Sequence, residues 1–321
     1  MKSTVTAAVA LAATALAVGV GHQIRVVGRL RNRLDPHRDH DFADVPLRDI
    51  DGTERHVVSK DGTKIRIVEF GPEEGELVLL MHGFVSTGAV WNLIIGSLVS
   101  AGRRVIVPEQ RGHGGSSLGS SGYELEALGH DLAAVIESLP FGKHLTVVGH
   151  SMGSVSMFSM ALERPDITVR IDRNVIVSGL HRGRGEHPLV EMRRFVLGAR
   201  WYNWLRSNHT QGIFFTRSAL GPNAPYSLVA ATHRMYLQAN SALIQDMGRR
   251  LLTFDFRHAL PHMKAPSVLI VGTADIKTPP AVARSIARHL PDAELIEIPH
   301  VGHMTPLEVP NVIIDVVLSA A

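Results

Sequence analysis

The chain contains no cysteine among its 321 residues. Disulfide bonds, cysteine nucleophiles and cysteine-ligated metal sites are therefore excluded. Aromatic residues are also few, at 5% of the chain, and no run of basic residues alternates with them. The formal net charge is only +3, and a charge this small does not indicate a nucleic-acid partner. What remains is a composition typical of a globular protein, with 45% hydrophobic and 20% charged residues, long enough to bury a large core.

The amino terminus is apolar and alanine-rich over residues 1–22, and a polar connector follows over residues 23–50. The apolar run at 5–20 is slightly shorter than the roughly twenty residues that a membrane-spanning helix needs. Lys2 precedes the run, and residues 15–17 (Ala-Leu-Ala) resemble the cleavage site of a secretory signal. We therefore expect either a membrane anchor, with the arginines after the run favouring a cytoplasmic location of the folded part, or a cleaved signal that directs secretion. If neither applies, a cytoplasmic protein is expected.

Residues 51–321 show apolar runs that alternate with helix-like segments. The strand-like runs are 76–81, 104–107, 145–149, 174–178, 266–271 and 293–298. A hairpin precedes them, with Asp61-Gly62 as a favoured two-residue turn. Strands that alternate with helices predict an α/β fold with a mostly parallel sheet covered on both faces. Residues 181–260 contain no convincing strand, and we expect them to form a helical cap above the sheet.

The segment LTVVGHSMG at residues 145–153 contains the pattern Gly-x-Ser-x-Gly. A strand-forming run leads into the pattern, and a helix-like segment follows it at once. This layout is typical of a nucleophile elbow, in which a sharp strand-to-helix turn exposes one serine hydroxyl. Glycine is required at Gly149 and Gly153, because a side chain there would collide with the neighbouring backbone. The segment therefore predicts Ser151 as a nucleophile.

The same pattern occurs a second time, at residues 115–119, with Ser117 in the central position. No strand-forming run leads directly into this copy, and no helix begins at Ser117. The surrounding residues are rich in glycine and serine, a composition typical of a turn-rich loop. We therefore expect Ser117 to lie in a loop and to have no catalytic role.

A serine hydroxyl is a poor nucleophile unless a base, usually a histidine oriented by a carboxylate, lies beside it. In a parallel sheet the reactive groups gather beyond the carboxyl ends of the strands. Asp275 follows the apolar run at 266–271, and His303 follows the run at 293–298. The order serine, aspartate, histidine fits this architecture. We predict that Ser151, Asp275 and His303 form a catalytic triad.

Other acidic and histidine residues fit these roles less well. Asp246 and Asp255 fall within the expected cap, where we expect solvated charges. His300 lies closer to the strand end than the predicted base and is expected to be structural. His113 and His150 are expected to hydrogen-bond within their own loops.

An oxyanion formed during attack on a carbonyl needs hydrogen-bond donors, which are usually backbone N–H groups. The residue after the nucleophile, Met152, is expected to supply one of them. The turn after the run at 76–81 is expected to supply the other, through the N–H of Phe84. The side chain of His82 is expected to brace this turn and not to react.

Five motifs in this order resemble those of the α/β-hydrolase superfamily: LLMHGF, EQRGHGGSS, VVGHSMGS, VGTADIKTPP and VGHMTPLEVP. The resemblance implies an α/β-hydrolase fold with a sheet of about eight strands, a cap inserted after the sixth, and the triad named above. Glu109 stands where the family often has aspartate. Ser154 stands where a second glycine commonly follows the elbow, so looser packing of the next helix is expected. A serine nucleophile also argues against epoxide hydrolases and haloalkane dehalogenases, which use aspartate.

Together these residues predict a serine hydrolase that cleaves a carboxylic ester or related acyl substrate through an acyl-enzyme, without metal or organic cofactor. Two alternatives stay open. One is a perhydrolase or acyltransferase that uses the same triad, and the other is a non-catalytic ligand-binding protein on the same fold. The apolar residues of the expected cap and the apolar amino terminus favour a small apolar acyl substrate.

The two hypotheses for residues 1–22, a membrane anchor and a cleaved signal, predict different masses of the mature protein. An anchor predicts an intact amino terminus in the membrane fraction, whereas a cleaved signal predicts the loss of these residues. Mass spectrometry of the amino terminus in membrane and soluble fractions of expressing cells distinguishes them. An intact terminus found in the soluble fraction would contradict both.

Overall fold

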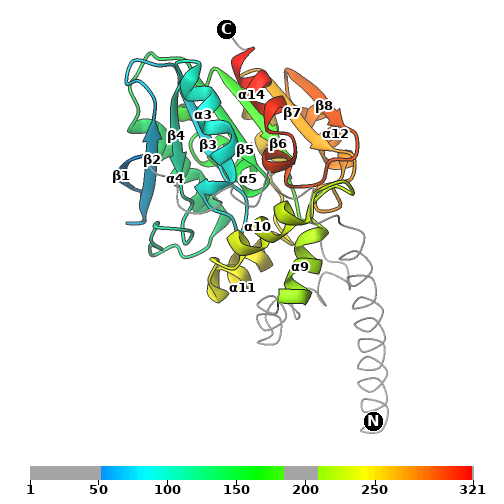
Figure 1. The fold of residues 1–321 in the computed structure, drawn as a ribbon. Coiled ribbons are helices and arrows are strands. Elements are labelled where there is room, and N and C mark those ends of the chain that lie inside the picture. The colour runs from blue at the N-terminus through cyan, green and yellow to red at the C-terminus, as the bar shows by residue number, and fades with distance from the viewer. Residues whose placement is uncertain (1–51, 184–208, 320–321) are drawn as a thin grey trace.

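The structure, a computed structural model, describes residues 52–183 and 209–319. These residues form one eight-stranded sheet in the order β1-β2-β4-β3-β5-β6-β7-β8 (Figure 1). The pairs β1–β2 and β2–β4 are antiparallel, and all other neighbouring strands are parallel. The predicted mostly parallel sheet of the α/β-hydrolase fold is therefore confirmed.

The strands are β1 (Thr53–Val58), β2 (Lys64–Phe70), β3 (Leu77–Met81), β4 (Arg104–Pro108), β5 (Leu145–His150), β6 (Arg173–Val177), β7 (Ser267–Gly272) and β8 (Ala293–Ile298). The helices of the described residues are η2 (Gly88–Trp91), α3 (Asn92–Ser100), α4 (Leu125–Glu137), α5 (Met152–Glu163), α6 (Pro165–Thr168), α9 (His209–Arg217), α10 (Tyr226–Tyr236), α11 (Ser241–Arg250), η3 (Arg257–His262), α12 (Pro280–His289), α13 (Thr305–Glu308) and α14 (Pro310–Leu318). Each expected strand-like run lies within two residues of an observed strand.

The loop between β1 and β2 differs from the two-residue turn that we expected. Pairing of the two strands ends at Val58 and Lys64, so residues 59–63 all belong to the connection. The turn runs over Ser59–Gly62, where the N–H of Gly62 donates to the carbonyl of Ser59 over 3.0 Å and Gly62 has a φ of 85°, so the turn is longer than two residues. The Oδ2 atom of Asp61 accepts a hydrogen bond of 3.0 Å from the buried guanidinium of Arg111. The loop after β4 is thereby attached to the hairpin, and Asp131 holds the same guanidinium from the other side.

Two hydrophobic clusters cover the two faces of the sheet. Successive residues of a strand point to opposite faces, and in β3 the side chains of Leu77 and Leu79 join one cluster while those of Val78 and Leu80 join the other. The first cluster includes side chains from α4, α5 and α12, and the second includes side chains from α3, α10 and α14. Helices therefore cover both faces, as the fold class predicts.

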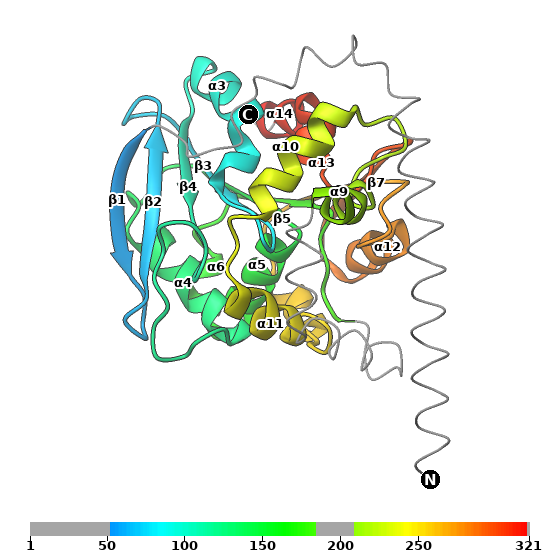
Figure 2. The same ribbon diagram turned by 60° about the horizontal axis from the view of Figure 1, so that its bottom comes forward.

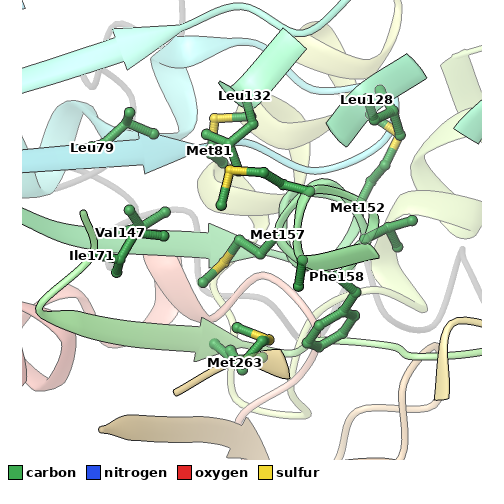
Figure 3. Close-up of a cluster of buried hydrophobic side chains, with 14 of the residues drawn as sticks. Leu79, Met81, Leu128, Leu132, Val147, Met152, Met157, Phe158, Ile171 and Met263 are labelled. Atoms are coloured by element: carbon green, nitrogen blue, oxygen red, sulfur yellow. The ribbon is translucent and has the colours of Figure 1, made fainter. Parts of the chain in front are cut away.

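Methionine side chains fill much of the first cluster around α5. Figure 3 shows them among aliphatic and aromatic neighbours, with Met81, Met152, Met157 and Met263 labelled. The flexible thioether side chain fills irregular gaps in a core. Because the side chain of Met152 is fully buried there, the first residue of α5 is firmly anchored beneath the turn that precedes the helix.

The chain between β6 and β7 is helical in its described part, where α9, α10 and α11 lie beyond the carboxyl ends of the parallel strands (Figures 1 and 2). We call this segment the β6–β7 insertion. Apart from an isolated bridge between Arg182 and Asp255, its described residues form no strand pairing. The tryptophans and the tyrosine at 201, 202 and 204 lie outside the described residues.

The apolar segment at 1–22 and the connector at 23–50 also lie outside the described residues. Over 52–183 and 209–319, none of the helices combines the length and the apolar character that crossing a membrane requires. The expectations for the amino terminus therefore stay predictions.

Packing of α4 against α5 depends on Gly129. A Cβ atom at this position would lie 2.6 Å from the backbone nitrogen of Met160, so we expect Gly129→Ala to reduce the free energy of unfolding by about 1–3 kcal/mol. Gly96 is the matched control, because it is also a helical glycine but has open space around it. Gly96→Ala should increase the free energy of unfolding by about 0.5–1 kcal/mol. Urea unfolding measures both, and equal effects would contradict the role of Gly129.

Candidate active site

Ser151 lies at the sharp turn between β5 and α5. Its backbone has φ 50° and ψ −113°, a conformation that residues other than glycine seldom adopt. The two flanking glycines are sterically necessary. A Cβ on Gly153 would collide with the carbonyl oxygen of Met81 in β3, and a Cβ on Gly149 would lie 2.9 Å from the carbonyl carbon of Gly153. This is the local geometry that the sequence predicts for the elbow.

Backbone strain is concentrated at the carboxyl edge of the sheet. The non-glycine residues with positive φ in the described part of the chain are Val85, Ser151, Ser178 and His300. They follow β3, β5, β6 and β8, respectively. Such conformations cost on the order of 1–3 kcal/mol each and cluster at functional sites in proteins. Their shared position marks this edge as the candidate active site.

The structure brings Ser151, His303 and Asp275 together in one hydrogen-bonded chain. The distance from Ser151 Oγ to His303 Nε2 is 3.0 Å, and the distance from His303 Nδ1 to Asp275 Oδ2 is 2.8 Å. The carboxylate accepts from Nδ1–H, so the lone pair of Nε2 is directed at the serine hydroxyl. All three side chains are buried. An arrangement of this kind can remove the proton of the serine as the serine attacks an electrophile.

Asp275 is ionised at neutral pH despite its burial. Burial by itself raises the pKa of this carboxyl, but the charge and hydrogen bond of His303 and the hydrogen bonds of Thr278 lower the pKa to about 2. Backbone N–H groups of Lys277 and Thr278 donate to Oδ1 over 2.8 and 2.9 Å. The carboxylate is therefore both charged and fixed in orientation beside the imidazole.

The turn after β3 lies directly beside the nucleophile. A Cβ on Gly83 would be 3.3 Å from the Cβ of Ser151. The Nδ1–H of His82 donates to the carbonyl oxygen of Gly83 over 2.8 Å, and Nε2 accepts from the N–H of Gln110 over 3.0 Å. Because a trans peptide is planar, this bond turns the N–H of Phe84 away from His82. The side chain of His82 thus braces the turn, as expected from the sequence.

His82 is held neutral by its environment. Burial lowers the pKa of its imidazole to about 4, although the hydrogen bond to Gly83 opposes that shift. The carbonyl of His82 accepts a short hydrogen bond from the side-chain amide of Gln110. The Oε1 atom of that amide accepts from the hydroxyl of Ser156 on α5 over 2.5 Å. The bracing of the turn is therefore connected to the helix that begins at the elbow.

The expectation for His150 was wrong. Its Nε2–H does not bond within its own loop but donates to the carbonyl oxygen of His303 over 2.9 Å. The ring centroids of the two histidines are 5.1 Å apart. This contact forms because parallel strands bring the end of β5 and the loop after β8 to the same edge. Burial lowers the pKa of His150 to about 3, so it stays a neutral donor.

His113, Asp246 and Asp255 lie where the sequence predicts, whereas the structural role expected of His300 stays a prediction. His113 donates through Nδ1–H to the carbonyl of Arg111, within its own loop, over 3.0 Å, and His300 is exposed. Asp246 and Asp255 are exposed, and each pairs with an arginine, Arg249 and Arg257, respectively. Within 52–183 and 209–319, no group of three or more histidine, aspartate and glutamate side chains could hold a metal ion.

The hydroxyls of Ser117 and Ser154 form hydrogen bonds with the backbone. Ser117 lies in an exposed loop, where its hydroxyl accepts a hydrogen bond of 2.8 Å from the backbone N–H of Lys64. Ser154, which was expected to loosen the packing of α5, is fully buried. Its buried hydroxyl donates to the carbonyl of Ser151 over 2.7 Å and accepts from the N–H of Leu180 over 3.1 Å. The elbow is thereby attached to the chain that leaves β6.

One contributor to the site was missed from the sequence. Glu308 on α13 accepts hydrogen bonds from the N–H of Gly302 over 3.0 Å and from the N–H of Gly221 over 2.7 Å. The first amide belongs to the His303 loop and the second to the β6–β7 insertion. The carbonyl of Ala219 adds a bond of 2.7 Å from the N–H of His303. The only signal in the sequence is the glutamate of VGHMTPLEVP, which does not reveal its partners.

Comparisons with known proteins identify the family and the fold. The model of the alpha/beta hydrolase family matches residues 77–316. A putative carbamate hydrolase of Variovorax paradoxus is 27% identical over 73% of this chain and 86% of its own. The Karrikin insensitive 2 receptor IA of Petunia hybrida is 24% identical over 75% of this chain and 88% of its own. An esterase from Exiguobacterium antarcticum has a similar structure, with a TM-score of 0.73, 19% identity and coverage of 84% and 98% of the two chains.

The low pKa of Asp275 predicts a pH dependence of stability. Its pKa falls from the ordinary 3.8 to about 2 in the folded protein, so ionised Asp275 stabilises the fold above the unfolded pKa. That contribution, about 2 kcal/mol, is lost as the pH falls through the folded pKa. In urea unfolding, the difference in stability between wild type and Asp275→Asn should shrink by most of this amount from about pH 7 to about pH 2.5. A difference for Asp275→Asn that is constant with pH would contradict the assignment.

Proposed function

Because the chain belongs to the alpha/beta hydrolase family, we propose that it is a serine hydrolase that cleaves a carboxylic ester or a related acyl substrate. Membership of this family supports a hydrolase with a small-molecule substrate. The observation that carries the finer proposal is the hydrogen-bonded chain from Ser151 through His303 to Asp275. A buried serine, a base and an ionised carboxylate in this order are the requirements of acyl transfer through a serine ester.

In the proposed mechanism, His303 Nε2 accepts the proton of Ser151 as its Oγ attacks the carbonyl carbon. Asp275 stabilises the imidazolium that forms, through the 2.8 Å bond to Nδ1. The imidazolium then gives the proton to the leaving group as the bond to the leaving group breaks. Water, activated by the same His303, releases the acid and restores the serine.

The proposed oxyanion site consists of the backbone N–H groups of Phe84 and Met152. Two features support it. Met152 is the first residue of α5, so its N–H is among those that a helix leaves without a partner in the preceding turn. The hydrogen bond from His82 to the carbonyl of Gly83 fixes the peptide that carries the N–H of Phe84. Donors fixed before the reaction stabilise the developing charge without reorganisation.

The relatives support an acyl substrate. A carbamate and a carboxylic ester both present a carbonyl carbon bound to a heteroatom leaving group, and these are the bond types in the names of the Variovorax and Exiguobacterium proteins. The apolar composition of the β6–β7 insertion, which includes Leu228, Val229 and Met235, favours an apolar acyl group. Product analysis in the presence of peroxide or an alcohol separates hydrolysis from transfer to another acceptor.

A second candidate function, that of a ligand-binding receptor, is favoured by the similarity to the Petunia receptor. The two functions differ in whether Ser151 is reactive. A fluorophosphonate forms a covalent bond with an activated serine, so mass spectrometry of the treated protein distinguishes an enzyme from a receptor with an unreactive serine. We expect one adduct, located on Ser151.

Replacement of the nucleophile tests the proposed function directly. Ser151→Ala removes the attacking oxygen, so we expect turnover of p-nitrophenyl esters to fall by at least about a thousandfold. Ser117→Ala is the matched control, because Ser117 occupies the same sequence pattern but its hydroxyl bonds to the N–H of Lys64 in β2. It should leave turnover unchanged. Turnover that survives in Ser151→Ala would refute the proposal.

A further inference from the structure

Thr278 lies in the loop after β7, three positions after Asp275, and only 4% of its surface is exposed. Its hydroxyl is close to three polar atoms that belong to different segments. The distances from Oγ1 are 2.8 Å to Asp275 Oδ2, 3.2 Å to His303 Nδ1 and 2.9 Å to the carbonyl oxygen of Ser178. The hydroxyl therefore touches both the acid and the base of the proposed triad.

The negative charge of Asp275 determines in which direction the hydroxyl of Thr278 donates its proton. A threonine hydroxyl has a single proton and two lone pairs. Both Asp275 Oδ2 and the carbonyl of Ser178 are acceptors, and the ionised carboxylate is the stronger one. With the proton directed at Oδ2, a lone pair of Oγ1 is available to the Nδ1–H of His303. The hydroxyl of Thr278 then donates to Asp275 and, together with Asp275, accepts from the Nδ1–H of His303.

The hydrogen bond from the hydroxyl of Thr278 completes the set of donors around the carboxylate of Asp275. Oδ1 accepts from the backbone N–H groups of Lys277 and Thr278, and Oδ2 accepts from His303 and from the hydroxyl of Thr278. A carboxylate offers about four lone-pair sites, so each has a donor. Loss of the hydroxyl leaves Oδ2 with His303 as its remaining donor.

The same hydroxyl is part of a longer polar connection below the site. Ser178, at the end of β6 with φ 47°, places its own hydroxyl 3.1 Å from Oγ1 of Thr305. Thr305 in turn donates to the carbonyl of Gly302, one residue before His303, over 3.3 Å. The loops after β7 and β8 are thus joined through the end of β6.

We propose that Thr278 is a positioning residue of this active site, whose hydroxyl holds Asp275 Oδ2 and His303 Nδ1 in the orientation that directs Nε2 at Ser151. The inference rests on the proposed function. Thr278 acts through the acid and the base, so its loss lowers the rate of the chemical step and leaves substrate binding unchanged.

The test compares Thr278→Val with Thr278→Ser. Valine keeps the shape of threonine but removes the hydroxyl, whereas serine keeps the hydroxyl. Thr232→Val is the matched control. Thr232 is fully buried on α10, and its hydroxyl bonds to the carbonyl of Leu228. The measurements are the rate at which a fluorophosphonate labels Ser151, kcat and KM for a p-nitrophenyl ester, and thermal unfolding.

We expect Thr278→Val to slow labelling and to lower kcat on the order of tenfold, the loss that follows from one hydrogen bond to a charged group. KM should stay close to that of wild type, whereas the melting temperature should fall moderately, because the buried carboxylate of Asp275 loses one donor. Thr278→Ser should restore most of the rate, and Thr232→Val should label like wild type. A role limited to packing predicts the opposite pattern. Thr278→Val, which keeps the shape of threonine, would then label like wild type, and Thr278→Ser, which lacks the methyl group, would have the lower melting temperature.

The outcomes separate the two proposals. Wild type that is not labelled overturns the proposed function, and this inference with it. Labelling of wild type and Thr278→Val at the same rate overturns the inference alone. If Thr278→Val does not fold, Thr278→Ala removes the same hydroxyl without placing an added methyl group beside the carboxylate. Thr278→Ala must then show the same tenfold loss in labelling rate and kcat, and Thr278→Ser must again retain most of both.

Discussion

The candidate active site depends on one hydrogen bond, between the hydroxyl of Ser151 and Nε2 of His303. It joins residues that are 152 positions apart in the sequence, and it exists because parallel strands end at one edge of the sheet. The loops after β5, β7 and β8 meet there and deliver the serine, the acid and the base. The alternating side chains of these strands are buried in the two hydrophobic clusters, and this burial holds the strand ends in register.

The hydrogen bond between Ser151 and His303 requires strained backbone conformations and close packing of α5 against β3. Val85 and Ser151 hold conformations that cost free energy, and Gly153 is needed so that α5 can approach β3. Hydrogen bonds between loops offset part of this cost. His150 fixes the carbonyl of His303, and Glu308 connects the same loop to the β6–β7 insertion. The position of the insertion and the position of the base are therefore coupled.

Much of this was predictable from local sequence. Apolar runs of strand length, separated by helix-like segments, predict the parallel sheet because a strand buried on both faces needs apolar side chains at every position. Ser151 could be separated from Ser117 because only Ser151 has a strand before it and a helix after it. Asp275 and His303 could be selected because each follows a strand, and strand ends converge at one edge.

The sequence by itself thus determined the order of the elements and the identity of the three residues of the hydrogen-bonded chain. Only the tertiary structure determines which other groups hydrogen-bond to these three residues and to their loops. The partners of His150, Glu308 and Thr278 lie on loops that are distant in the sequence, and nothing in residue spacing specifies which loop ends meet. The hydrogen bonds of Thr278 show the reason. A threonine two residues before an ordinary helix is unremarkable in sequence, and its role depends on atoms that only folding brings within 3.2 Å.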